Sequence, residues 1–243
     1  MQVCLSIHPH GAPLNLKQQA AEYALHYVHD DMVLGLGSGT TTQHFIALLG
    51  ASLQKGAYQN ILAIPTSDQT AEQVRSLDIP LTTLAQHPQL DLVIDSADEV
   101  DPRLNLLKGL GRALLREKIL AIQTNRFVVI VDESKISPRL GSRAPLPVEI
   151  ACFEAESHVR WLNTLGCRAE LWLEPAGDPI LTDNGNYLAR CWFETGILDE
   201  HALARLLADR PGIIEHGLFL GMASQVVVAA TSGIRILERD QCI

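Results

Sequence analysis

Short apolar runs alternate with amphipathic segments along the first half of the chain. Four runs with the length and β-branched content of buried strands lie at residues 32–36, 61–65, 92–94 and 126–131. Residues 15–28 repeat apolar side chains every three or four positions, with Asn15 as the expected N-cap, and residues 45–49 and 71–77 also have helical spacing. Residues 81–84 are a further candidate for a short strand. This alternation predicts an α/β fold with a doubly wound, mostly parallel sheet.

The pattern changes after residue 150. Helical spacing is expected at residues 157–165 and 199–207. Extended segments, with an Asn-Gly hairpin turn between the second and the third, are expected at residues 169–173, 179–186, 187–194 and 212–218. Two last strands, 226–230 and 234–237, are expected to return to the first sheet. We therefore predict a catalytic α/β domain of residues 1–145 plus 220–243 and a second, smaller α+β domain of residues 146–219.

Polar residues follow four of the expected strands at the point where each strand ends. These positions lie near Ser38, Thr66, Asp95 and Asp132. Open α/β sheets bind ligands beyond the carboxyl ends of their strands, so we expect these residues to meet at one active-site edge.

Residues 37–42, Gly-Ser-Gly-Thr-Thr-Thr, join the first expected strand to a helix. Glycines let backbone N–H groups converge at a helix N-terminus and hydroxyls add donors, which indicates an anion site. The Gly-Lys-Ser/Thr of a Walker loop and the third glycine of a dinucleotide fingerprint are missing, so a nucleotide is not required. A single sugar phosphate fits as well, and a tight structural turn is the alternative.

The stretch from Asp95 to Lys118 contains most of the candidate catalytic side chains. Glu117, about two turns into the helix after a glycine loop, is the candidate base for proton transfer, and Lys108 is the candidate for stabilising negative charge on oxygen. Asp95 and Asp98 are candidates for handling hydroxyl protons, and their proximity would raise the pKa of one of them. The alternative is a solvated loop in which Glu117 belongs to a set of surface charges and Asp98 caps a turn.

Composition narrows the class of protein. The 243 residues are 47% hydrophobic, enough for a sizeable core, and 19 Lys and Arg against 28 Asp and Glu give a charge of −9, which argues against nucleic acid as a partner. Nine scattered histidines show no metal-ligand spacing, and five distant cysteines show neither a zinc site nor a disulfide framework. Residues 1–13 lack signal-peptide features and are expected to form a loose extension, and no run is long enough to span a bilayer. We expect a soluble, cytoplasmic protein without a membrane partner.

At this point the motifs support a resemblance. In order, they are GLGSGTTTQHF (35–45), PTSDQT (65–70), DSADEVD (95–101), KGLGRALLREK (108–118), DESK (132–135), PLPVEI (145–150) and TDNGN (182–186). Together they resemble ribose-5-phosphate isomerases of the A type over nearly all of the chain past residue 14. The resemblance implies interconversion of D-ribose 5-phosphate and D-ribulose 5-phosphate through a cis-enediolate, without a metal or cofactor, by a homo-oligomer (dimer or tetramer).

The resemblance also assigns roles to residues. It makes Glu117 the general base and gives Asp95, Asp98 and Lys108 parts in ring opening and stabilisation of the intermediate. Its expected substrate contacts are Ser38, Gly39, Thr40, Thr41, Gly109, Gly111, Lys135 and Lys17, of which Lys135 and Lys17 are candidates for neutralising a phosphate.

The chain departs from the family pattern at three places. Leu110 and Arg112 interrupt a loop that is usually three glycines followed by alanine, and Met222 to Gln225 replace the usual Gly-Ala-Asp. These departures leave open a non-catalytic sugar-phosphate sensor of the same fold, although a sensor has no need of Glu117 and its partners. An amino-sugar phosphate deaminase is a further alternative.

Overall fold

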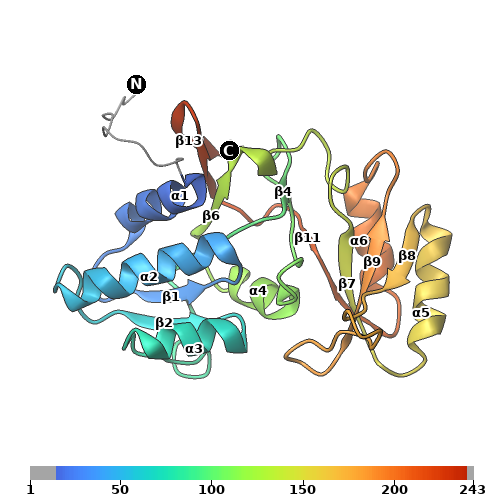
Figure 1. Ribbon diagram of the computed structural model, residues 1–243, viewed down its shortest axis with the longest axis horizontal. Helices are drawn as coiled ribbons and strands as arrows, with labels where there is room; N and C mark the ends of the chain where they lie inside the picture. The colour runs from blue at the N-terminus through green and yellow to red at the C-terminus, as the bar shows by residue number, and fades with distance from the viewer. Residues whose placement is uncertain (1–14, 240–243) are drawn as a thin grey trace.

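The computed structural model describes residues 15–239, and its largest sheet has six strands in the order β13-β12-β6-β3-β1-β2 (Figure 1). The strands are β1 (Val33–Leu36), β2 (Leu62–Pro65), β3 (Leu92–Asp95), β6 (Phe127–Asp132), β12 (Gln225–Ala230) and β13 (Gly233–Glu238). All neighbours pair in parallel except β12 and β13, which pair antiparallel. The predicted mostly parallel sheet is confirmed. The expected extension at residues 1–13 lies outside the described part of the chain.

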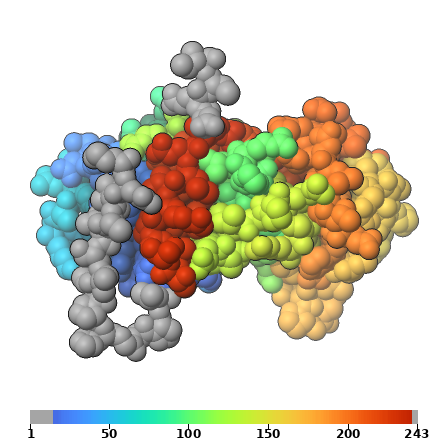
Figure 2. Space-filling model, turned by 90° about the horizontal axis from the view of Figure 1, so that it is seen from above, coloured from blue at the N-terminus to red at the C-terminus, as the bar shows by residue number. Residues whose placement is uncertain are grey.

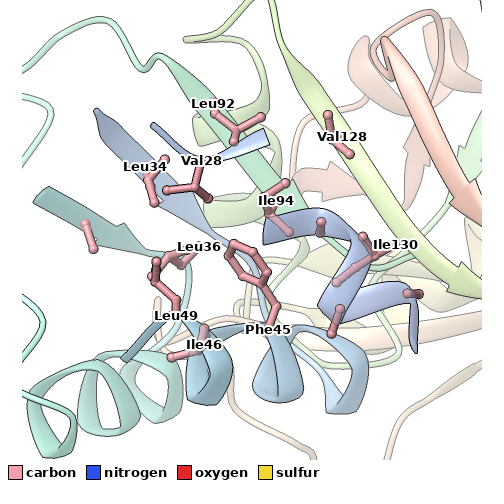
Figure 3. Close-up of a cluster of buried hydrophobic side chains, with 14 of the residues drawn as sticks. Val28, Leu34, Leu36, Phe45, Ile46, Leu49, Leu92, Ile94, Val128 and Ile130 are labelled. Carbon is pink, nitrogen blue, oxygen red and sulfur yellow. The ribbon is translucent and has the colours of Figure 1, made fainter. Parts of the chain in front are cut away.

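Helices cover both faces of this sheet. They are α1 (Leu16–Ala24), α2 (Thr40–Gln54), α3 (Asp68–Ser76) and α4 (Leu114–Ala121). Side chains alternate along β1, so Leu34 and Leu36 pack with Phe45 of α2 on one face (Figure 3), whereas Val33 packs with Leu120 of α4 on the other. The sheet therefore has two apolar faces, each with its own core, as expected for a doubly wound fold.

A second sheet is antiparallel throughout, in the order β10-β7-β9-β8. Its strands are β7 (Leu146–Ile150), β8 (Arg168–Leu171), β9 (Tyr187–Trp192) and β10 (Ile213–His216). The helices α5 (Ala155–Leu162) and α6 (Glu200–Ala208) pack against it through a separate apolar core. This part, yellow to orange, lies at one end of the long axis of the molecule (Figures 1 and 2).

Three two-residue strands join the two parts of the chain. These are β4 (Glu99–Val100), β5 (Leu106–Leu107) and β11 (Leu218–Phe219), and they form a sheet in the order β11-β5-β4. Sequence patterning missed this sheet because two residues are too few to show a period. It takes strands from both predicted domains, so the boundaries 1–145 plus 220–243 and 146–219 stay our proposal.

Several predicted elements have different limits in the structure. The first helix ends at Ala24 and is followed by a 3-10 turn (Leu25–Tyr27), although Asn15 caps it by accepting from the N–H of Gln18. The expected strand at 81–84 is wrong: Leu81 makes one bridge to Ala63, and the chain then turns at Thr83.

The expected strand at 179–186 is also reduced to isolated bridges, although the predicted turn forms there. The N–H of Gly185 donates to the carbonyl of Thr182 at 2.9 Å, and Gly185 has φ +75°, a value that favours glycine.

No helix within residues 15–239 is long and apolar enough to cross a membrane.

Candidate active site

A cavity of about 280 Å³ opens at the carboxyl ends of β1 and β3, between the start of α2, the loop after β5 and the helix α4. Every predicted site residue except Asp95 lines it: Lys17, Ser38, Gly39, Thr40, Thr41, Asp98, Lys108, Gly109, Gly111, Glu117 and Lys135. Asp95 is buried and contacts Lys108, which lines the cavity. Ser96, Ala97 and Leu110 complete the lining and were not predicted as site residues, although each adjoins one in the sequence.

A second hollow, of about 530 Å³, lies at the opposite edge of the large sheet, where β6 and β12 begin. It is lined by Tyr27, Asn125, Arg126, Ser224, Gln225, Glu238 and Arg239. None of the predicted site residues belongs to it, and Glu238 is the single carboxylate that residues 15–239 contribute to its lining. Chemistry rather than volume therefore identifies the first cavity as the candidate active site.

Lys108 joins two carboxylates at the base of the cavity. Its Nζ lies 2.9 Å from Asp95 Oδ2 and 3.2 Å from Glu117 Oε2, and it also donates to the backbone carbonyl of Ser96. The three charged side chains are exposed by 3% or less. A buried charge is tolerated when it is paired and hydrogen-bonded, so each carboxylate depends on Lys108 and the Lys108 ammonium depends on the two carboxylates.

Each of the three side chains comes from a different element. Asp95 ends β3, Lys108 follows β5 and Glu117 belongs to the first turn of α4. The expected position of Glu117, about two turns into the helix, is wrong because α4 begins only at Leu114. Gly37 makes room for Asp95, because a Cβ on this glycine would lie 2.0 Å from the Asp95 carboxylate. The positions therefore depend on close approach between segments that are distant in the sequence.

Burial controls protonation in the cavity. Burial, and then the charge of Asp95, raises the pKa of Glu117 to about 8 against the opposing effect of Lys108. Burial likewise raises the pKa of Asp95, which Lys108 lowers in part. For Lys108, burial acts to lower the pKa, but the two carboxylates outweigh it and the pKa is raised. The site therefore keeps the Lys108 ammonium beside Glu117, a carboxyl group that holds its proton to unusually high pH.

Asp98 organises the glycine loop at the rim of the cavity. Its Oδ2 accepts a hydrogen bond of 2.9 Å from the N–H of Leu110, and its pKa is raised because burial outweighs that bond. Gly109 has φ +107° and a Cβ there would lie 2.8 Å from the side chain of Leu114, so the loop requires glycine at this position.

The Arg112 side chain points away from the cavity. Its guanidinium lies 2.7 Å from Glu174 Oε1 and 5.5 Å from the ring centroid of Trp172. Its φ of +66° is a value that glycine adopts more easily. Arg112 therefore adds no charge to the lining, whereas Leu110 lines the cavity directly.

The loop between β1 and α2 forms the other end of the cavity. Gly39 is the N-cap of α2 with φ +104°; no side chain caps this helix and its first turn has no acidic residue, so its N–H groups and dipole favour an anion. Ser38 Oγ lies 2.9 Å from Thr66 Oγ1 and 2.8 Å from Ser67 Oγ, which anchors the loop in a buried hydroxyl network.

Two further cations line the cavity. Lys17 of α1 donates from Nζ to Thr40 Oγ1 at 2.8 Å, so the first helix does reach the anion loop. Lys135 lines the cavity from the 3-10 turn Glu133–Lys135 after β6. Within residues 15–239, no three His, Cys, Asp or Glu side chains are grouped as metal ligands.

Comparison with known proteins gives a consistent result. The family model described as ribose 5-phosphate isomerase A (phosphoriboisomerase A) matches residues 62–233. Ribose-5-phosphate isomerase A of Roseiflexus castenholzii is 48% identical over 222 residues, which cover 91% of this chain and 94% of that protein. Probable ribose-5-phosphate isomerase 2 of Arabidopsis thaliana is 46% identical over 237 residues, covering 93% of this chain and 89% of that protein.

Solved structures agree with the sequence comparison. A D-ribose-5-phosphate isomerase in complex with phospho-erythronic acid has a TM-score of 0.89 at 38% identity, covering 92% of this chain and 98% of that one. Ribose 5-phosphate isomerase from Plasmodium falciparum has a TM-score of 0.89 at 33% identity, covering 93% of this chain and 98% of that one. The likeness thus extends over both larger sheets.

Proposed function

The chain belongs to the ribose 5-phosphate isomerase A family, and we propose that it interconverts D-ribose 5-phosphate and D-ribulose 5-phosphate in the cavity between α2 and α4. One observation carries the proposal for the site: Glu117 and the Lys108 ammonium face one cavity together, 3.2 Å apart, with an anion-binding loop at its other end. An aldose–ketose isomerase needs these parts: a base, an electrophile for the developing oxyanion and a phosphate site.

Glu117 is the proposed general base. Its carboxylate removes the proton on C2 of open-chain ribose 5-phosphate, the C–H electrons form the C1–C2 double bond, and negative charge passes to O1. The Lys108 ammonium stabilises that charge. Glu117 then returns its proton to C1 while the hydroxyl proton on O2 passes to O1, which leaves the ketone at C2.

The raised pKa of Glu117 suits this role. A general base transfers protons best when its pKa lies near the working pH, and burial brings the pKa of Glu117 to about 8. Asp95 supports Lys108 from the side away from the cavity lining, and Asp98, which holds the Leu110 N–H, is placed to exchange hydroxyl protons during ring opening.

The phosphate is proposed to bind at the N-terminus of α2. Thr40 and Thr41 lie in the first turn of this helix, and Lys17 and Lys135 add positive charge. Gly109 and Gly111 line the cavity nearer to Glu117, where a close backbone approach to the sugar is possible. Phospho-erythronic acid, the ligand of the related solved structure, carries a phosphate and a carboxylate, so it is a suitable probe of both ends.

An isomerisation assay tests the proposal. Purified protein mixed with ribose 5-phosphate is expected to form ribulose 5-phosphate, and the absence of product would overturn it. The non-catalytic sensor would show thermal stabilisation by ribose 5-phosphate without turnover, and the amino-sugar deaminase would release ammonia from glucosamine 6-phosphate. The comparisons favour neither alternative, because the relatives reported above are described as isomerases.

We also keep a homo-oligomer, dimer or tetramer, as a proposal. Ile122 and Phe153 are large apolar side chains exposed by 64% and 82%, and they are the residues that we propose a second copy covers. Sedimentation equilibrium would test it, and a single monomeric species would contradict it.

A cytoplasmic location is proposed on the free thiols of Cys152, Cys167 and Cys191, and fractionation of the source cells would test it.

A further inference from the structure

Lys118, the lysine of α4, lies in a largely buried polar cluster on the side of the helix next to β10. The Nζ of Lys118 lies 2.6 Å from Glu215 Oε1 and donates to the backbone carbonyl of His216 at 2.6 Å. The Lys118 side chain is 13% exposed and that of Glu215 is 24% exposed. Lys118 follows Glu117 directly, yet it faces β10 and takes no part in the cavity lining. The proposed mechanism leaves this buried charge without a function.

The segment that Lys118 contacts, residues 215–219, also contacts the backbone of Lys108. The carbonyl of Gly217 accepts a hydrogen bond of 2.8 Å from the N–H of Lys108. A Cβ on Gly217 would lie 2.1 Å from the carbonyl oxygen of Lys108, so the two backbones are in close contact. Two residues further on, the Phe219 ring centroid lies 5.4 Å from Lys108 Nζ and 4.9 Å from Lys118 Nζ. One ring therefore contacts both ammonium groups.

Hydrogen bonds within this cluster connect the segment to α4. Burial, and then the neighbouring Lys118, lowers the pKa of His216 to about 4, so its imidazole is neutral at neutral pH. A neutral imidazole lets Nδ1 accept from the N–H of Leu218, which lies 3.2 Å away. Glu215 Oε1 accepts from the N–H of His216 at 2.8 Å as well as from Lys118. Side-chain and backbone bonds thus hold residues 215–218 together against α4.

We propose that Lys118 is a positioning residue for the proton-transfer step, because it fixes the 215–219 segment that supports Lys108 beside Glu117. The inference rests on the proposed function of this cavity. In the bound geometry, the ammonium of Lys108 must stay close to the oxygen that becomes charged while Glu117 reaches the adjacent carbon. A shift of about 1 Å in such a pair lowers the rate by as much as ~10²-fold. Phosphate binding uses Lys17, Lys135 and α2, none of which contacts Lys118.

The test compares Lys118→Met with the matched control Arg190→Met. Arg190 also pairs with a carboxylate, 2.8 Å from Glu170, and lies 5.4 Å from the ring centroid of Trp172, but it does not line the cavity. Lys118→Met is expected to lower kcat by on the order of 10- to 100-fold and to leave KM within about threefold. Arg190→Met is expected to keep both constants within about twofold, since a cation pair outside the active site affects mainly stability.

The outcomes separate the two claims. If the wild type and Arg190→Met do not isomerise ribose 5-phosphate, the proposed function fails. If both are active and Lys118→Met has the same kcat as Arg190→Met, only the positioning role is overturned. Should Lys118→Met fail to fold, Lys118→Gln retains a donor for the His216 carbonyl and is expected to fold with kcat lowered at least about threefold at unchanged KM; an unchanged kcat in that variant would overturn the role.

Discussion

Glu117 Oε2 lies 3.2 Å from the ammonium of Lys108, with both side chains exposed by 3% or less. An ionised carboxylate in such a place is costly, and the proposed function requires a base near neutral pH at this position. The pKa of Glu117 is raised to about 8 because ionising this buried carboxyl group is unfavourable. Stability and activity are therefore expected to respond in opposite directions when this residue is changed.

The first prediction concerns stability against pH. A carboxyl whose pKa is raised on folding stabilises the folded state below its unfolded pKa, and this contribution is lost as pH rises through the folded pKa, here about 8. Glu117→Gln removes the titrating group, so its free energy of unfolding is expected to exceed that of the wild type by on the order of a few kcal/mol at pH 9, with little difference at pH 4. Chemical denaturation at several pH values measures this; a gap independent of pH would contradict it.

The second prediction concerns the pH dependence of activity. The base acts when ionised, so kcat/KM is expected to rise with pH through the pKa of Glu117. Asp95→Asn leaves the effect of burial in place but removes the neighbouring negative charge, which is the second cause of the raised pKa. Lys108 still lowers the pKa of Glu117, so the acid limb of the profile is expected to move to lower pH. The profile is measured relative to each variant's own maximum, because Asp95→Asn also lowers the maximum. An acid limb that stays in place would show that another group titrates.

Gly37 gives a third prediction. Gly37→Ala places a methyl group 2.0 Å from the Asp95 carboxylate, so Asp95 must move and the variant is expected to lose about 1–3 kcal/mol of stability together with most of its kcat. Gly111→Ala is the stability control, because a Cβ at that position meets no atom within 4 Å. Thermal unfolding of both variants, followed by steady-state kinetics, separates the cases; equal stability of the two would contradict the close approach.

The departures from the family pattern give a fourth prediction. Arg112→Gly relieves a left-handed backbone angle worth about 1–2 kcal/mol and removes a surface ion pair worth about 0–1 kcal/mol, so stability is expected to stay the same or rise slightly. Its kcat and KM are expected to stay within about twofold, because the side chain faces Glu174. Leu110→Gly, in the cavity lining, is expected to raise KM by giving the loop more freedom. Kinetics that reverse this ranking would contradict the placement of the two side chains.

Local patterns in the sequence were enough to predict much of the site. Apolar runs identify β1 and β3, and because parallel strands end at one edge, Asp95 and the Gly39 loop are expected to meet there. The contact between Lys108 and Gly217 could not be predicted in this way. Residues 108 and 217 meet across more than a hundred positions through strands of two residues, which leave no periodic signal.

The contacts of Lys118 likewise could not be predicted from patterns in the sequence. A Glu-Lys pair on a short helix is typical of a solvated face, and here the two side chains are buried against different neighbours. Tertiary packing, rather than spacing along α4, decides which of these charges faces the cavity and which faces β10.

The most direct test of the account follows the proton on C2 of ribose 5-phosphate in deuterated water, for the wild type and for Glu117→Gln. The wild type is expected to form ribulose 5-phosphate and to exchange the transferred hydrogen with solvent. Glu117→Gln is expected to slow both by about 10²–10⁴-fold, the usual share of a general base, while binding phospho-erythronic acid with a Kd close to that of the wild type. A Glu117→Gln variant that isomerises at the wild-type rate would contradict the assignment of Glu117 as the base.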